Sequence, residues 1–165
     1  MSGHRGHTLA EPQFPGDDGQ ADQRLVEAGG DDVAVLTVFG GVRVFVPIVP
    51  VLGERATDGQ HRTVPSDTDK SADMAAVLMT GADGRTALLA FSSVTALESW
   101  NSAARPVPVF GADAARAALD EGAEAILLDL GGPGFTVIET DDVRHLAEGH
   151  QLISTPDGPA WVASP

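Results

Sequence analysis

Long apolar runs alternate with short polar turns over residues 74–149 and predict most of the secondary structure. The runs 74–80 and 86–91 flank the turn sequence Gly-Ala-Asp-Gly-Arg, which predicts a β-hairpin. Both runs are apolar throughout rather than at every second position, which indicates strands that are covered on both faces. Further strands are predicted at 105–110, 125–130 and 135–139. Helices are predicted at 22–28, 94–100, 113–122 and 140–149.

The residues before the hairpin allow two interpretations. By propensity, the Val-rich segments 33–39 and 42–49 read as two strands joined by the Gly40-Gly41 turn. Asp31 and Asp32 stand just before the first segment, however, and acidic residues suit the N-terminus of a helix. We predict a strand at 42–49, while the residues alone leave helix and strand open for 33–39.

Three segments lack a hydrophobic period. Residues 1–20 are polar and rich in Gly and Pro, which predicts a disordered N-terminal tail. Residues 53–72 are expected to form a mobile loop. Residues 151–165 are expected to be a C-terminal tail, or to add a weak strand around Trp161. The folded domain is therefore expected to span residues 21–150.

The way the predicted elements follow one another indicates the fold class. Some strands are joined by hairpins and others by helices, which implies a mixed sheet of about five to six strands with helices packed against it. Pro106 and Pro108 remove two backbone donors from the 105–110 strand, so we expect this strand at an edge. The prediction is an α+β (α/β layered) domain.

Three stretches occur in an order that resembles the N-terminal domain of the SseB (enhanced serine sensitivity protein B) family. They read FSSVTALESWN, ARPVPVFG and ALDEGAEAILLDLGGPG, and the resemblance extends over roughly residues 22–150. It implies a helix rather than a strand for residues 33–39, and we adopt that prediction. The family's name refers to serine tolerance, and its nomenclature links it to a neighbouring sulfurtransferase. No agreed set of catalytic residues comes with the resemblance, because the molecular activity of the family is not established.

Charge and cysteine content restrict the function. The 165-residue chain carries 24 acidic against 10 basic residues, a formal net charge of −14. Such a surface repels nucleic acid and anionic lipid, so we expect neither as a partner. The chain has no cysteine, which excludes thiol-based sulfur transfer within it. No long uncharged apolar run occurs, and the N-terminal residues do not resemble a secretory signal, so a cytoplasmic location is expected.

The candidate chemical motifs have simpler structural explanations. Asp67, Asp69, Ser71 and Asp73 alternate like calcium ligands, but Ala72 stands where such a loop needs glycine and Leu78 where it needs an acid. The sequence Gly-Gly-Pro-Gly at 131–134 lacks the Gly-Lys-Ser/Thr of a phosphate loop and predicts a turn. We predict no catalytic, cofactor-binding or metal-binding residue.

One hypothesis places a ligand site at the rim of the sheet. If the strands that end near residues 91, 110 and 130 are parallel, their carboxyl ends meet at one edge, where α/β sheets commonly bind ligands. The residues brought together would be Ser92, Ser93, Gly111 and Asp129. The alternative is that the serines only cap the helix that follows.

A second hypothesis concerns a partner surface formed by Trp100, Arg105 and Pro106, because Trp and Arg are enriched at interface hot spots. The alternative is that Trp100 only closes its helix onto the sheet. Together these observations predict a non-catalytic protein-binding or regulatory module that binds a protein or self-associates. A small-molecule sensor or enzyme that uses Ser92, Gly111 and Asp129 is the second hypothesis, and a purely structural module is the third.

Overall fold

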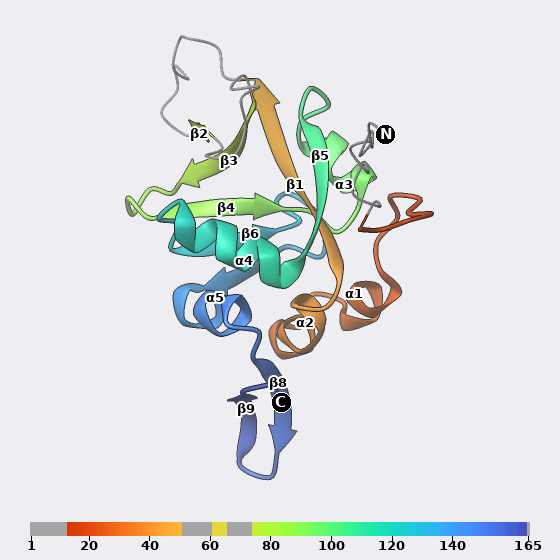
Figure 1. Ribbon diagram of the computed structural model, residues 1–165, viewed down its shortest axis with the longest axis vertical. Helices are drawn as coiled ribbons and strands as arrows, with labels where there is room; N and C mark the ends of the chain where they lie inside the picture. Colours follow the sequence, from red (N-terminus) through yellow and green to blue (C-terminus); the bar gives the residue numbers. More distant parts are fainter. Residues whose placement is uncertain (1–12, 51–60, 66–73, 165) are drawn as a thin grey trace, which may run out of the picture.

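A mixed sheet forms the centre of the computed structural model, which describes residues 13–50, 61–65 and 74–164 (Figure 1). Its strands follow the order β5 (Arg105–Phe110), β1 (Arg43–Pro50), β3 (Met74–Thr80), β4 (Thr86–Ala90), β6 (Ala125–Leu128) and β7 (Thr136–Glu139). The strands β4 and β6 are parallel, whereas the other neighbours along this order are antiparallel. The mixed sheet confirms the predicted α+β class, and β5 lies at an edge, as its two prolines predicted.

Helices cover both faces of the sheet. They are α1 (Gln23–Ala28), α2 (Asp32–Phe39), α3 (Val94–Trp100), α4 (Gly111–Asp120) and α5 (Thr140–Ala147). Residues of α1, α2, α4 and α5 share one hydrophobic cluster with the sheet, and α3 contributes to a second cluster. In Figure 1 the helices α4 and α5 lie side by side in front of the sheet.

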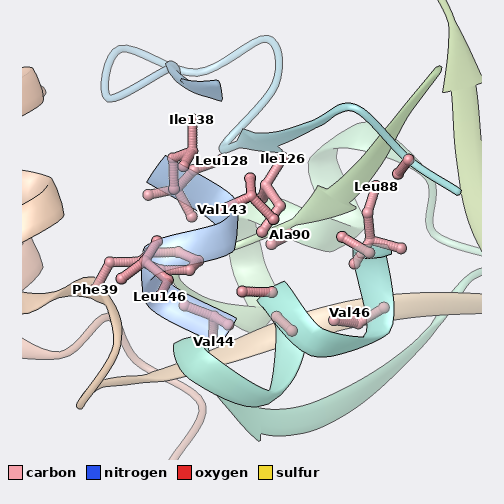
Figure 2. Close-up of a cluster of buried hydrophobic side chains, with 14 of the residues drawn as sticks. Phe39, Val44, Val46, Leu88, Ala90, Ile126, Leu128, Ile138, Val143 and Leu146 are labelled. Carbon is pink, nitrogen blue, oxygen red and sulfur yellow. The ribbon is translucent and has the colours of Figure 1, made fainter. Parts of the chain in front are cut away.

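Successive residues of β4 and of the position after it belong to different clusters. Leu88 and Ala90 belong to the first cluster, and Leu89 and Phe91 to the second, and all four are fully buried. This confirms that the continuously apolar run reflects a strand covered on both faces. Figure 2 shows the first cluster, in which side chains of α2, β1, β4, β6, β7 and α5 meet.

The segment at 33–39 is helical, as the resemblance implied. Asp31 caps α2, because its side chain accepts a hydrogen bond of 2.9 Å from the backbone N–H of Ala34. The helix buries Val35 and Phe39 in the first cluster. Capping and burial therefore outweigh the strand propensity of its valines.

Parts of the predicted tail and loop have defined structure. Residues 13–20 pack against the domain, where the ring of Phe14 meets that of Phe110 edge to face at 4.7 Å. The prediction of disorder is therefore wrong for 13–20, and residues 1–12 lie outside the described residues. Within the predicted 53–72 loop, β2 (His61–Pro65) pairs antiparallel with β3. The remaining loop residues, with the calcium-like sequence, also lie outside the described part.

The C-terminal residues form a hairpin instead of a tail. The strands β8 (Gln151–Thr155) and β9 (Gly158–Val162) pair antiparallel and project from the body of the domain (Figure 1). Trp161 packs against the first hydrophobic cluster, and Leu152 is buried. The alternative of a strand around Trp161 is thus confirmed. No helix among the described residues is long and apolar enough to cross a membrane.

Candidate functional site

The parallel pairing of β4 and β6 brings Ser92 and Asp129 together, because each follows the carboxyl end of its strand. The backbone N–H of Ser92 donates to Asp129 Oδ1 at 2.7 Å, and its hydroxyl donates to Oδ2, also at 2.7 Å. Asp129 has a φ of 56°, in the left-handed region where few residues other than glycine occur. The carboxylate is therefore held in place from two sides, by its own backbone turn and by Ser92.

The environment of Asp129 disfavours the ionised form of its carboxyl group. Burial raises the pKa of this carboxyl above its ordinary value of 3.8, and the two hydrogen bonds from Ser92 act in the opposite direction. Among the described residues, no cation forms an ion pair with the carboxylate. Asp129 is thus a partly buried acid whose negative charge has no counter-ion in this part of the chain.

Two cavities border residues 129–134 of the β6–β7 connection. The first, which we name the acid pocket, has a volume of about 320 Å³ and lies between α1 and this connection. The second, which we name the α3 groove, has a volume of about 530 Å³ and is lined by Ala96, Ser99 and Trp100 of α3. Asp129 and Pro133 line both cavities.

Two residues of the predicted rim have structural roles instead. Ser93 caps α3, because its hydroxyl oxygen accepts a hydrogen bond of 3.0 Å from the N–H of Ala96. Gly111 does not line the acid pocket, since β5 pairs antiparallel with β1 and does not lie beside β4 and β6. A Cβ atom at Gly111 would lie 1.9 Å from the carbonyl oxygen of Phe39. The expected convergence of Gly111 with Ser92 and Asp129 is therefore wrong, and Gly111 permits the close approach of α4 to the end of α2.

The residues of the predicted partner surface are separated. Trp100 is partly buried, and its ring lies 5.6 Å from that of Phe91 in the second hydrophobic cluster. It also lines the α3 groove. Arg105 is exposed and Pro106 partly buried on β5, and neither lines the groove. Trp100 thus closes its helix onto the sheet and also borders the cavity that contains Asp129.

Residues 22–145 match the family described as SseB protein N-terminal domain. The chain belongs to the SseB family. A comparison with the curated proteins gives no match, and neither does one with the solved structures. The matched part of the SseB domain contains Ser92, Asp129 and all of α3, and it ends before the β8–β9 hairpin.

A buried arginine of this SseB domain supports the site, although little in the sequence indicated it. Arg43 on β1 is only 9% exposed, and its Nη1 donates to the carbonyl oxygen of Ser92 at 2.7 Å. Its Nε and Nη2 contact the two carboxylate oxygens of Asp17 at 2.8 and 2.9 Å. Arg43 also donates to the carbonyl of Gln20, so it ties the N-terminal segment to the end of β4. The one available signal was a lone charge within an apolar run.

The two histidines whose side chains the structure describes, His145 and His150, lie in another region. His145 stacks on Trp161 with ring centroids 5.0 Å apart, and its Nδ1 lies 2.9 Å from Nδ1 of His150. Trp161 in turn donates to Asp142 at 3.0 Å. These contacts hold the C-terminal hairpin against α5. Within the described residues, no group of three or more His, Asp or Glu could hold a metal ion.

Proposed function

We propose that this SseB domain is a non-catalytic regulatory module of the cytoplasm that binds a segment of a protein partner in the α3 groove. The observation that carries the proposal is the composition of the groove. One wall contains the partly buried Trp100, and the other is formed by residues 129–133, which include Leu130 and the small residues Gly131 and Gly132. Aromatic side chains that are anchored in the core yet border an open cavity are typical of binding hot spots.

The chemistry around Asp129 supports binding over catalysis. Among the described residues that line the acid pocket, Ser92 and Asp129 have polar side chains, and the others are apolar residues, glycines and a proline. A serine nucleophile needs a base that can take its proton near neutral pH, usually an imidazole. The hydroxyl of Ser92 instead donates to a carboxylate, which is a weak base for this purpose.

A small-molecule sensor remains the second candidate function, favoured by the acid pocket itself. This cavity of about 320 Å³ has a hydrogen-bonded acid and apolar walls, which is the usual composition of a ligand site. A metabolite bound there would raise the melting temperature of the wild type but not of Asp129→Ala. A melting temperature that no metabolite changes would speak against the sensor.

Site-specific photo-crosslinking tests the proposed function in cells. Ser99 lines the α3 groove and is exposed, so a photoreactive residue placed there should crosslink to a specific protein. A photoreactive residue at Asp157, exposed in the β8–β9 turn, serves as the control position. Equal crosslinking from both positions would contradict a partner in the groove.

A pair of matched variants supplies the second test. Ser99→Arg fills the groove with a long side chain, and Ser154→Arg adds the same side chain to an exposed site on β8. We expect the first variant to lose the crosslinked partner in a pull-down and the second to retain it. If both variants retain it, the partner does not bind in the α3 groove.

A further inference from the structure

The acid pocket has a negative charge that the described residues leave unneutralised. Among the described residues, Asp129 accepts hydrogen bonds only from the backbone N–H and the hydroxyl of Ser92, which are both uncharged donors. Each carboxylate oxygen can accept more than one hydrogen bond, so both retain acceptor capacity toward the cavity. An acid that is partly buried without a counter-ion is costly unless a cation completes the site.

The nearest buried cation cannot serve as this counter-ion, because it is already engaged. The guanidinium of Arg43 pairs with both carboxylate oxygens of Asp17 and donates to two backbone carbonyls, including that of Ser92. No charge of Arg43 contributes to the pKa of Asp129, which burial and Ser92 determine. No cation among the described residues completes the pocket, and a cation of another molecule can do so.

The walls of the pocket fit a cation on an aliphatic stem. Leu25, Val35 and Leu128 are buried beneath it, and Val26 is 55% exposed at its side. Gly30 and Gly134 contribute no side chain, and a Cβ on Gly30 would lie 3.7 Å from the Cα of Gly134. Lys and Arg side chains combine a charged end with an apolar stem that packs on such walls.

We infer that the acid pocket binds a Lys or Arg side chain of the partner segment, whose positive charge pairs with Asp129. This inference rests on the proposed function and names the chemistry of the partner. The segment lies along the α3 groove and crosses residues 129–134, and its basic side chain enters the acid pocket. Asp129 and Pro133 line both cavities, so a single segment can occupy them together.

The charge of the whole chain favours the same partner. The formal net charge is −14, and the described arginines Arg24, Arg85, Arg116 and Arg144 each pair with a carboxylate of the chain itself. A basic segment is therefore attracted at long range, whereas an acidic segment or a second copy of this chain is repelled.

Peptide selection on the full chain tests the inference. Random twelve-residue peptides are displayed and selected on the wild-type protein, and the affinities of the best binders are then measured by calorimetry. We expect the binders to share a Lys or Arg, and its replacement by glutamine to weaken binding about tenfold to a hundredfold. Asp129→Asn should weaken binding of the basic peptide by a similar factor and leave binding of the glutamine peptide unchanged. In a double-mutant cycle, this result means that the basic residue and Asp129 interact directly. Asp157→Asn removes one exposed charge elsewhere and should change neither affinity.

The outcomes separate this inference from the proposed function. One outcome is that the selected peptides need no basic residue and bind Asp129→Asn as well as wild type, while Ser99→Arg blocks them. This would overturn the inference of a basic partner but would still support binding in the α3 groove. Failure of every peptide to depend on the groove would overturn both. If n-butylammonium chloride binds in an Asp129-dependent manner and no peptide does, the ligand is a free amine, and the partner segment is excluded. The glutamine substitution in the peptide keeps the test decisive even if Asp129→Asn unfolds.

Discussion

Gly111→Ala should destabilise the domain strongly, because Gly111 allows α4 to touch the end of α2. A methyl carbon at this position would lie 1.9 Å from the carbonyl oxygen of Phe39 and 2.7 Å from its carbonyl carbon. Phe39 is fully buried at the end of α2, and a backbone group cannot rotate away from the new atom. Overpacking typically costs about 1–3 kcal/mol, and a backbone clash belongs at the upper end, near 3 kcal/mol or more.

Thermal and urea unfolding measure this effect. For a chain of this size, 1 kcal/mol shifts the melting temperature by roughly 2–4 °C, so Gly111→Ala should lower it by roughly 6–12 °C. Gly41→Ala is the matched control, since no atom lies within 4 Å of the added Cβ, and it should be neutral or stabilising by up to about 1 kcal/mol. A Gly111→Ala variant within about 0.5 kcal/mol of wild type would refute the packing role and reopen a ligand role for Gly111.

Three further predictions follow from the site and from the hairpin. Arg43→Met leaves Asp17 and the Ser92 carbonyl without their donor, so the free energy of unfolding in urea should fall by about 3–5 kcal/mol; an unchanged value would contradict the role of this buried ion pair. Because the pKa of Asp129 is raised on folding, ionisation costs stability, and the cost grows as pH rises above the ordinary value of 3.8. Asp129→Asn should therefore gain stability relative to wild type as the pH rises from 3.8 through the raised pKa, and a melting-temperature difference that does not change with pH would contradict the raised pKa. Trp161→Ala removes the stacking on α5, and an isolated hairpin is marginal in water, so amide hydrogen exchange in β8 should accelerate at least tenfold while β4 keeps its protection.

The periodic signals of the sequence predicted most of the elements. Continuous apolar runs predicted strands covered on both faces, and β4 has this environment because its alternate residues enter two clusters. The run at 33–39 could not be assigned by propensity, since valine favours strands, and the cap at Asp31 together with the burial of Phe39 decides for the helix. Local patterns therefore fail where tertiary packing outweighs them.

The candidate site could be predicted only in part. Ser92 and Asp129 were found because each follows an apolar run. The two residues come together because β4 and β6 are neighbouring parallel strands. Gly111 was wrongly grouped with them, because no local pattern shows that β5 pairs with β1. Arg43 was missed since its carboxylate partner lies 26 positions away, in a segment that reads as a polar tail.

Fluorescence of Trp100 tests the central claim, binding in the α3 groove, most directly. In the Trp161→Phe variant, Trp100 is the one remaining tryptophan of the chain. Addition of a selected basic peptide should shift its emission and reduce its quenching by acrylamide, with the same dissociation constant that calorimetry gives. Peptide binding that leaves the emission and the quenching of Trp100 unchanged would contradict the account.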